Sequence, residues 1–249
     1  MNQKSFSIAM LASMALCVMG PMVGLSRAAM PAHQFTVRIE NVSNENTLKP
    51  SNGAKVAIGL SPGVWLIHGK GEPLFTSGKP DRGKGLESLA EDGDTSALAQ
   101  SLREQAGVIS SGVFNTPVGA SAPGDIGPGQ AFEFTVSAAP GTWLSFATML
   151  AQSNDLFYAP GSHGIALFAK GRPISRNITS KILLWDAGTE VNEEPGIGPN
   201  QAPLQPAPHT GPREHGVVQP ISKVHDGFHY PGVSEVIRVT ITPLQQTAR

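Results

Sequence analysis

The sequence predicts an all-β fold, an antiparallel β-sandwich with a short helical insertion. Three observations support this fold class: apolar and polar residues alternate in short runs, glycine and proline separate these runs, and only one region has helical periodicity. With Gly 28 and Pro 21 in 249 residues, the chain is rich in turns but is not of low complexity. Strands without interleaved helices argue against a parallel α/β sheet.

The charge balance excludes two classes of function. Lys+Arg 18 against Asp+Glu 19 gives a net charge of −1. A nucleic-acid-binding domain carries a basic surface, and a disordered acidic tail carries excess negative charge. We therefore expect no nucleic-acid partner.

Residues 1–29 are expected to be a secretory signal peptide, and residues 30–249 a single sandwich domain. Lys4 supplies the basic start, residues 6–23 form the apolar segment, and small residues precede the cleavage point. Cys17 is the one cysteine, so the mature chain would contain no disulfide. We expect a secreted or periplasmic protein with no membrane span after signal cleavage.

The clearest strand is at residues 35–40, where apolar Phe35, Val37 and Ile39 alternate with polar residues. Such alternation indicates a strand with one buried face. A turn is expected at Pro62-Gly63. Further strands are expected at residues 56–60, 64–68, 131–136, 143–150, 165–168, 181–185 and 237–242.

The helical insertion is expected at about residues 84–107. A short helix over residues 86–90 would end at Gly93, and Asp94 or Thr95 would cap a second helix. The second helix is indicated by Leu98, Leu102 and Ala106, which recur every four residues.

A long surface loop is predicted at about residues 192–217. The segment contains six prolines and four glycines and has no periodicity. Loops of this length are usually functional or disordered.

Two acidic segments follow predicted strands. Asp155 comes soon after residues 143–150, and Asp186 comes directly after residues 181–185. If the two loops lie at the same end of the sandwich, carboxylates converge there, and Ca²⁺ favours such oxygen ligands. The alternative is that each aspartate only accepts hydrogen bonds within its own turn.

A second hypothesis is an exported metal-dependent enzyme. His209, His215, His225 and His229 cluster late in the chain, and imidazole is a common metal ligand. Glu193 or Glu194 would then act as the general base. The spacing of these histidines does not match a known catalytic metal motif.

Several segments together resemble the spondin domain, the N-terminal-type domain of F-spondin and mindin. Residues 185–190 are similar to its YDAGTD element, and residues 153–157 to its acidic turn. The resemblance is completed, in the family's order, by the strand at residues 35–40, the insertion beginning at residues 85–93 and the closing segment at residues 228–242.

The resemblance implies a β-sandwich that binds calcium through loops at one end. Carried over by position, Asp155 and Asp186 match the family's acidic ligands, and Glu133 and Glu190 are further candidate ligands. In animals the domain mediates adhesion, so the resemblance implies a non-enzymatic binding module for an extracellular or periplasmic protein or glycan. The mature chain lacks the cysteines of the animal proteins, so the fold is expected to carry over without their partners.

Overall fold

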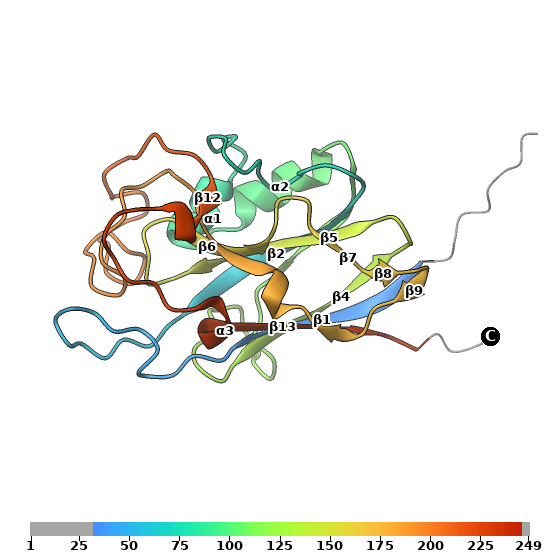
Figure 1. The fold of residues 1–249 in the computed structure, drawn as a ribbon, viewed down its shortest axis with the longest axis horizontal. Coiled ribbons are helices and arrows are strands. Elements are labelled where there is room, and N and C mark those ends of the chain that lie inside the picture. Colours follow the sequence, from blue (N-terminus) through green and yellow to red (C-terminus); the bar gives the residue numbers. More distant parts are fainter. Residues whose placement is uncertain (1–31, 246–249) are drawn as a thin grey trace, which may run out of the picture.

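The computed structural model describes residues 32–245, which fold into a two-sheet antiparallel β-sandwich (Figure 1). The predicted signal peptide at residues 1–29, with Cys17, lies outside the described residues. Strand β1 (His33–Asn41) pairs antiparallel with β13 (Ile237–Pro243), so the described chain begins and finishes at one end of the sandwich. Over the described range, no helix has the length and apolar character needed to cross a membrane.

The smaller sheet has four strands in the order β10-β13-β1-β4. The alternation in β1 works as predicted: Phe35, Val37 and Ile39 are fully buried between the sheets. The remaining strands of this sheet are β4 (Ala131–Ala138) and β10 (Arg176–Asn177).

The larger sheet has seven strands. Its main path is β12-β11-β6-β5-β2-β3, and β7 pairs with β5 at the side. Its strands are β2 (Leu60–His68), β3 (Val108–Phe114), β5 (Trp143–Leu150), β6 (Leu156–Pro160), β7 (Ile165–Ala166), β11 (Ile182–Asp186) and β12 (Gln219–Pro220). A separate hairpin joins β8 (Phe168–Ala169) and β9 (Arg172–Pro173).

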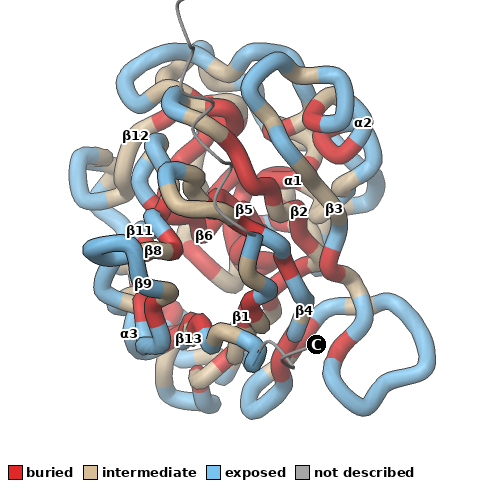
Figure 2. The backbone as a smooth tube through the Cα atoms, turned by 90° about the vertical axis from the view of Figure 1, so that its right-hand side faces the viewer, coloured by how far each residue is buried: buried red, intermediate tan, exposed pale blue. Residues whose placement is uncertain are grey.

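The larger sheet is buried on both faces, because two hydrophobic clusters cover it (Figure 2). Phe132 and Phe146 belong to the cluster between the sheets. Leu89, Leu102 and Trp185 belong to the cluster between the larger sheet and the helical insertion. Strands covered on both faces lose the apolar–polar alternation that marks a half-buried strand.

The helical insertion is confirmed as α1 (Leu86–Asp92) and α2 (Ser96–Glu104). Gly93 ends α1 at φ 70, where a Cβ would lie 2.9 Å from the Cβ of Ser61. Asp94 Oδ1 accepts a hydrogen bond from the Ser96 backbone N–H at 2.8 Å, which satisfies one free donor at the start of α2. Shorter helical turns are η1 (Thr179–Lys181), η2 (Ile221–Lys223) and α3 (Val233–Val236).

The predicted turn at Pro62-Gly63 is wrong, because β2 runs through both residues as one strand. The register shifts between Leu60 and Gly63, which places Pro62 in a bulge where its missing N–H breaks no ladder bond. Gly63 is required there, since a Cβ would collide with the Phe114 ring and the Ala147 carbonyl oxygen. The strand predicted at residues 56–60 is also wrong except for Leu60.

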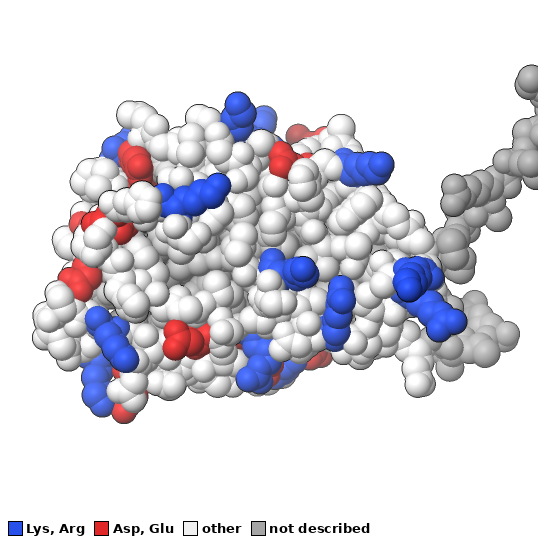
Figure 3. Space-filling view, viewed as in Figure 1, with Lys and Arg blue, Asp and Glu red and all other residues white. Residues whose placement is uncertain are grey.

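The long loop at residues 192–217 contains no helix or strand, as predicted, and it lies at the end of the sandwich opposite the described termini. Its own hydrogen bonds order it: Gln201 is fully buried, accepts from the Gly196 N–H and donates to the Glu194 carbonyl oxygen, both at 2.8 Å. On the face shown in Figure 3, most acidic side chains lie toward this loop end.

Candidate functional site

Asp155 and Asp186 come together at the loop end of the larger sheet. Asp155 directly precedes β6, Asp186 is the last residue of β11, and these strands are antiparallel neighbours. The Ala187 N–H donates to the Asp155 carbonyl oxygen at 3.2 Å, which ties the two strand ends together. The convergence of the two acidic segments is therefore confirmed, and both side chains are buried, with 0% and 2% exposed.

One carboxylate oxygen of Asp155 is satisfied and the other is not. Oδ2 accepts hydrogen bonds from the Thr189 N–H at 2.7 Å, the Thr189 hydroxyl at 3.2 Å and the Glu190 N–H at 3.2 Å. Oδ1 is buried and has no hydrogen-bond partner among the described residues. A buried polar atom without a partner costs ~1–3 kcal/mol, and more when it is charged.

Asp186 closes a tight turn after β11. Its Oδ1 accepts from the Gly188 N–H at 2.7 Å, and its Oδ2 accepts from the side-chain amide of Asn192 at 2.7 Å. Gly188 has φ 69, and a Cβ there would lie 2.6 Å from the Val217 nitrogen. Asp186 therefore accepts a hydrogen bond within its own turn, as in the alternative above, and it also lies beside Asp155 at the same end of the sheet.

The two aspartates cannot both be charged at little cost. The pKa of Asp186 is raised to about 6. Burial is the largest cause, the carboxylates of Glu214 and Asp226 also raise it, and the hydrogen bonds from Asn192 and Gly188 lower it. Burial, with repulsion from Asp186, raises the pKa of Asp155 well above its usual range. Without a cation, burial and mutual repulsion therefore favour the protonated form of these carboxyl groups.

The sequence analysis missed three residues around this pair: Asn192, Glu214 and Asp226. A cavity of ≈ 380 Å³ opens beside them and is also lined by Lys223 and His225. Tyr230 donates its hydroxyl proton to Asp226 Oδ2 at 2.5 Å. Asn192 and Glu214 lie in the proline-rich segment, which has no periodic pattern that could have indicated them.

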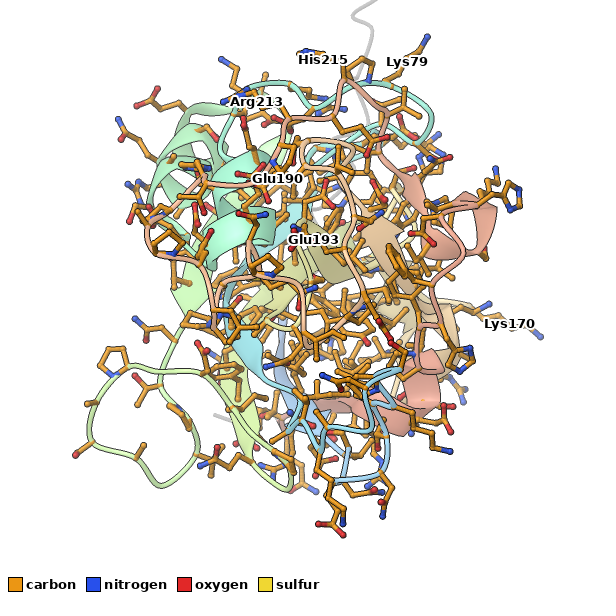
Figure 4. All side chains as sticks on the ribbon, turned by 90° about the vertical axis from the view of Figure 1, so that its left-hand side faces the viewer. Lys79, Lys170, Glu190, Glu193, Arg213 and His215 are labelled. Carbon is orange, nitrogen blue, oxygen red and sulfur yellow. The ribbon has the colours of Figure 1, made fainter. Side chains whose placement is uncertain are left out.

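Glu190 links this pair to a second acidic group. Its N–H bonds to Asp155, but its carboxylate points to another loop, where Oε1 accepts from the Gly211 N–H at 3.0 Å (Figure 4). Burial raises the pKa of Glu190, and repulsion from Glu91 raises it further.

Glu133 lies elsewhere. It is on β4 in the smaller sheet, opposite Arg38 of β1, and its carboxylate is 3.3 Å from the Arg38 guanidinium. The side chain is exposed, and its charge is directed at Arg38 and not at the Asp155–Asp186 pair.

The second acidic group lies between α1 and the proline-rich loop. Glu87, Glu91 and His209 each offer a ligand atom, and these atoms lie within 4.8 Å of one another, so the group could hold a metal ion. His209 Nδ1 is 2.5 Å from Glu91 Oε2, and its Nε2 is 3.2 Å from Asp92 Oδ2. The sequence did not indicate this group, because the contact spans 118 positions and His209 belongs to an aperiodic loop.

The structure does not gather the four late histidines. Across residues 32–245, the group with Glu87 and Glu91 is the one metal-type cluster of three or more side chains, and of the four histidines it includes His209 alone. The candidate bases are engaged elsewhere: Glu193 accepts from Asn200, and Glu194 from Ser51.

We expect His209→Asn to destabilise the protein more at pH 5.5 than at pH 9. The hydrogen bond to Glu91 raises the pKa of His209, so the contact stabilises the fold below the unfolded pKa of 6.5 and is lost as pH rises through the folded pKa. Because the ring is partly exposed, we expect a loss of roughly 2–4 °C in Tm at pH 5.5. His215→Asn, an exposed change in the same loop, is the control. An equal loss at both pH values would contradict the prediction.

In comparison with known proteins, no family model matches the sequence, and none of the curated proteins matches it. The resemblance to the spondin domain therefore stays a prediction that rests on the segments quoted above.

Proposed function

We propose that this chain is an exported, non-enzymatic binding module in which Ca²⁺, held by Asp155 and Asp186, orders the loops at one end of the sandwich. The observation that carries the proposal is the buried, unpartnered Oδ1 of Asp155 beside a second buried carboxylate. Ionising such a pair costs free energy. A bound divalent cation would offset the repulsion between the carboxylates and would give Oδ1 a partner.

The donor set suits Ca²⁺. It offers carboxylate oxygens from Asp155 and Asp186, with Glu214 and Asp226 close by and the amide of Asn192 on the same side. Ca²⁺ accepts six to eight oxygen ligands in flexible geometry, and carbonyl oxygens and water complete such sites. On this proposal, Glu190 contributes its backbone N–H to positioning Asp155, and its carboxylate belongs to the neighbouring group.

The role of the ion would be structural. The segments that it joins are the turn after β11 and the part of the chain near Asp226, which are far apart in sequence. Ordering them in advance lowers the entropy cost of binding a partner at this end. The partner would be an extracellular or periplasmic protein or glycan, as in adhesion.

The test is thermal unfolding of the purified protein in EDTA, followed by titration with Ca²⁺, Mg²⁺ or Zn²⁺. At a hundredfold excess over Kd, a bound ion adds ~2.7 kcal/mol, which corresponds to roughly 5–10 °C in Tm for a domain of this size. We expect this increase with Ca²⁺. No increase with Ca²⁺ would overturn the proposal, and an increase specific to Zn²⁺ would favour the alternative, an exported metal-dependent enzyme that uses the group at His209.

A further inference from the structure

A cavity with a volume of ≈ 700 Å³ lies on the outer face of the larger sheet. Leu183 and Trp185 of β11 form its floor, since Ile182 and Leu184 point into the core between the sheets. Helices α1 and α2 pack over β2, β3, β5 and β6, so this part of the sheet is left open. The volume is within the ~300–1,000 Å³ of typical small-molecule sites.

The walls of this cavity are fixed by contacts within the protein. The Trp185 indole N–H donates to the Ala159 carbonyl oxygen at 3.2 Å, and its ring lies 4.7 Å from the ring of Phe75. On the other side, Gly164 has φ 74, and a Cβ there would lie 2.6 Å from Ser145 Oγ, so the loop rests directly against β5. A preformed cavity lowers the cost of binding a ligand.

The surface inside is largely apolar. Leu183 is 39% exposed, and Phe168, Ile165 and Ala166 line the cavity with it. A mostly apolar cavity with a few polar groups is a typical feature of a ligand site.

The charged groups at the rim are basic. Arg176 and Lys181 line the cavity, and within residues 32–245 neither forms an ion pair. Among the described residues, no acidic side chain lines it. The carboxylate of Glu72, outside the lining, accepts a hydrogen bond from the Ser162 hydroxyl and lies 3.7 Å from His163 Nε2. On the face seen in Figure 3, basic side chains lie at both ends and across the centre.

We propose that this cavity binds a small amphiphilic anion: an organic molecule whose apolar body lies against Leu183 and Trp185 and whose single acidic group is held by Arg176 and Lys181. The acidic group can be a carboxylate, a sulfonate or a phosphate, because each forms charge-assisted hydrogen bonds with arginine and lysine. This site goes beyond the proposed function, since it involves neither Asp155 nor Asp186.

The test uses two dyes of similar shape and different charge, with the full chain in EDTA and again in Ca²⁺. Anilinonaphthalene sulfonate carries the anionic group, and N-phenylnaphthylamine lacks it. We expect saturable binding of the sulfonate and its displacement by decanoate but not by decanol. Arg176→Gln with Lys181→Gln should weaken the sulfonate about tenfold or more and leave the neutral dye within about twofold.

Lys170→Gln with Arg172→Gln is the matched control, because it removes two cations from the neighbouring β8–β9 hairpin that do not line the cavity. Leu183→Glu is a second probe: it changes a partly exposed residue and should abolish sulfonate binding. Non-saturable binding, or an equal loss in the control, would overturn the proposal. All variants should retain the calcium-dependent change in Tm, so failure of this site is distinguishable from failure of the calcium site.

Discussion

Asp155→Asn is expected to abolish the calcium-dependent increase in Tm while leaving the protein folded in EDTA. Burial and repulsion from Asp186 raise the pKa of Asp155, which favours its protonated form when no metal is bound, and asparagine has the shape of a protonated aspartate. Its amide oxygen can still accept from the Thr189 and Glu190 N–H groups. What it lacks is the negative charge that Ca²⁺ requires. Thermal unfolding in EDTA and in saturating Ca²⁺ measures both quantities.

Asp186→Asn should behave in the same way, with its loss of stability seen mainly in calcium. Glu133→Gln is the control, because Glu133 faces Arg38 in the other sheet and should leave the full calcium increase in place. If Asp155→Asn lowered Tm equally in EDTA and in Ca²⁺, the aspartate would be structural and the metal role would be lost. Loss of the calcium response in Glu133→Gln would show that the site includes a residue from the smaller sheet.

The strands that could be predicted are those with one buried face or a long apolar run. Strand β1 shows strict alternation and was predicted almost to its ends. Strand β6 was missed, because all five of its residues are buried and a short run of this kind has no period. Strand β3 was missed for the opposite reason, since Ser110, Ser111 and Gly112 at the sheet edge give little strand signal.

Some contacts of the candidate site could also be predicted from the sequence, and others could not. Asp155 and Asp186 each come at or after the end of a predicted strand, β5 and β11. Both strands pair antiparallel with β6 between them, so they run in the same direction and finish at the same end of the sheet. The contact of His209 with Glu91 could not be predicted, because it joins an aperiodic loop to a helix through side chains alone. Pro62-Gly63 lies in a bulge and not in the predicted turn, since the same two residues suit both structures.

In EDTA, the free energy of unfolding is expected to fall as pH rises from 5 to 8. The unfolded pKa of an aspartate is 3.8 and the folded pKa of Asp186 is about 6, so in this range the native state holds a proton that the unfolded state has released. The free energy of unfolding then decreases with pH, by roughly 1.4 kcal/mol between pH 5 and pH 8 for this residue. The raised pKa values of Glu91 and His209 also make stability fall as pH rises. The pKa of His68 is lowered by burial, so this residue makes stability rise with pH.

Calcium should oppose this fall in stability with pH, because Ca²⁺ binds Asp155 and Asp186 in their deprotonated form. The increase in Tm caused by Ca²⁺ is therefore expected to be small at pH 5 and largest at pH 8, where the metal replaces the proton. Comparing wild type with Asp186→Asn at each pH isolates this contribution from those of the histidines and of Glu91. A calcium increment that is independent of pH would mean that the ion binds away from the buried aspartates. A growing increment that persists in Asp186→Asn would assign the proton to another carboxylate.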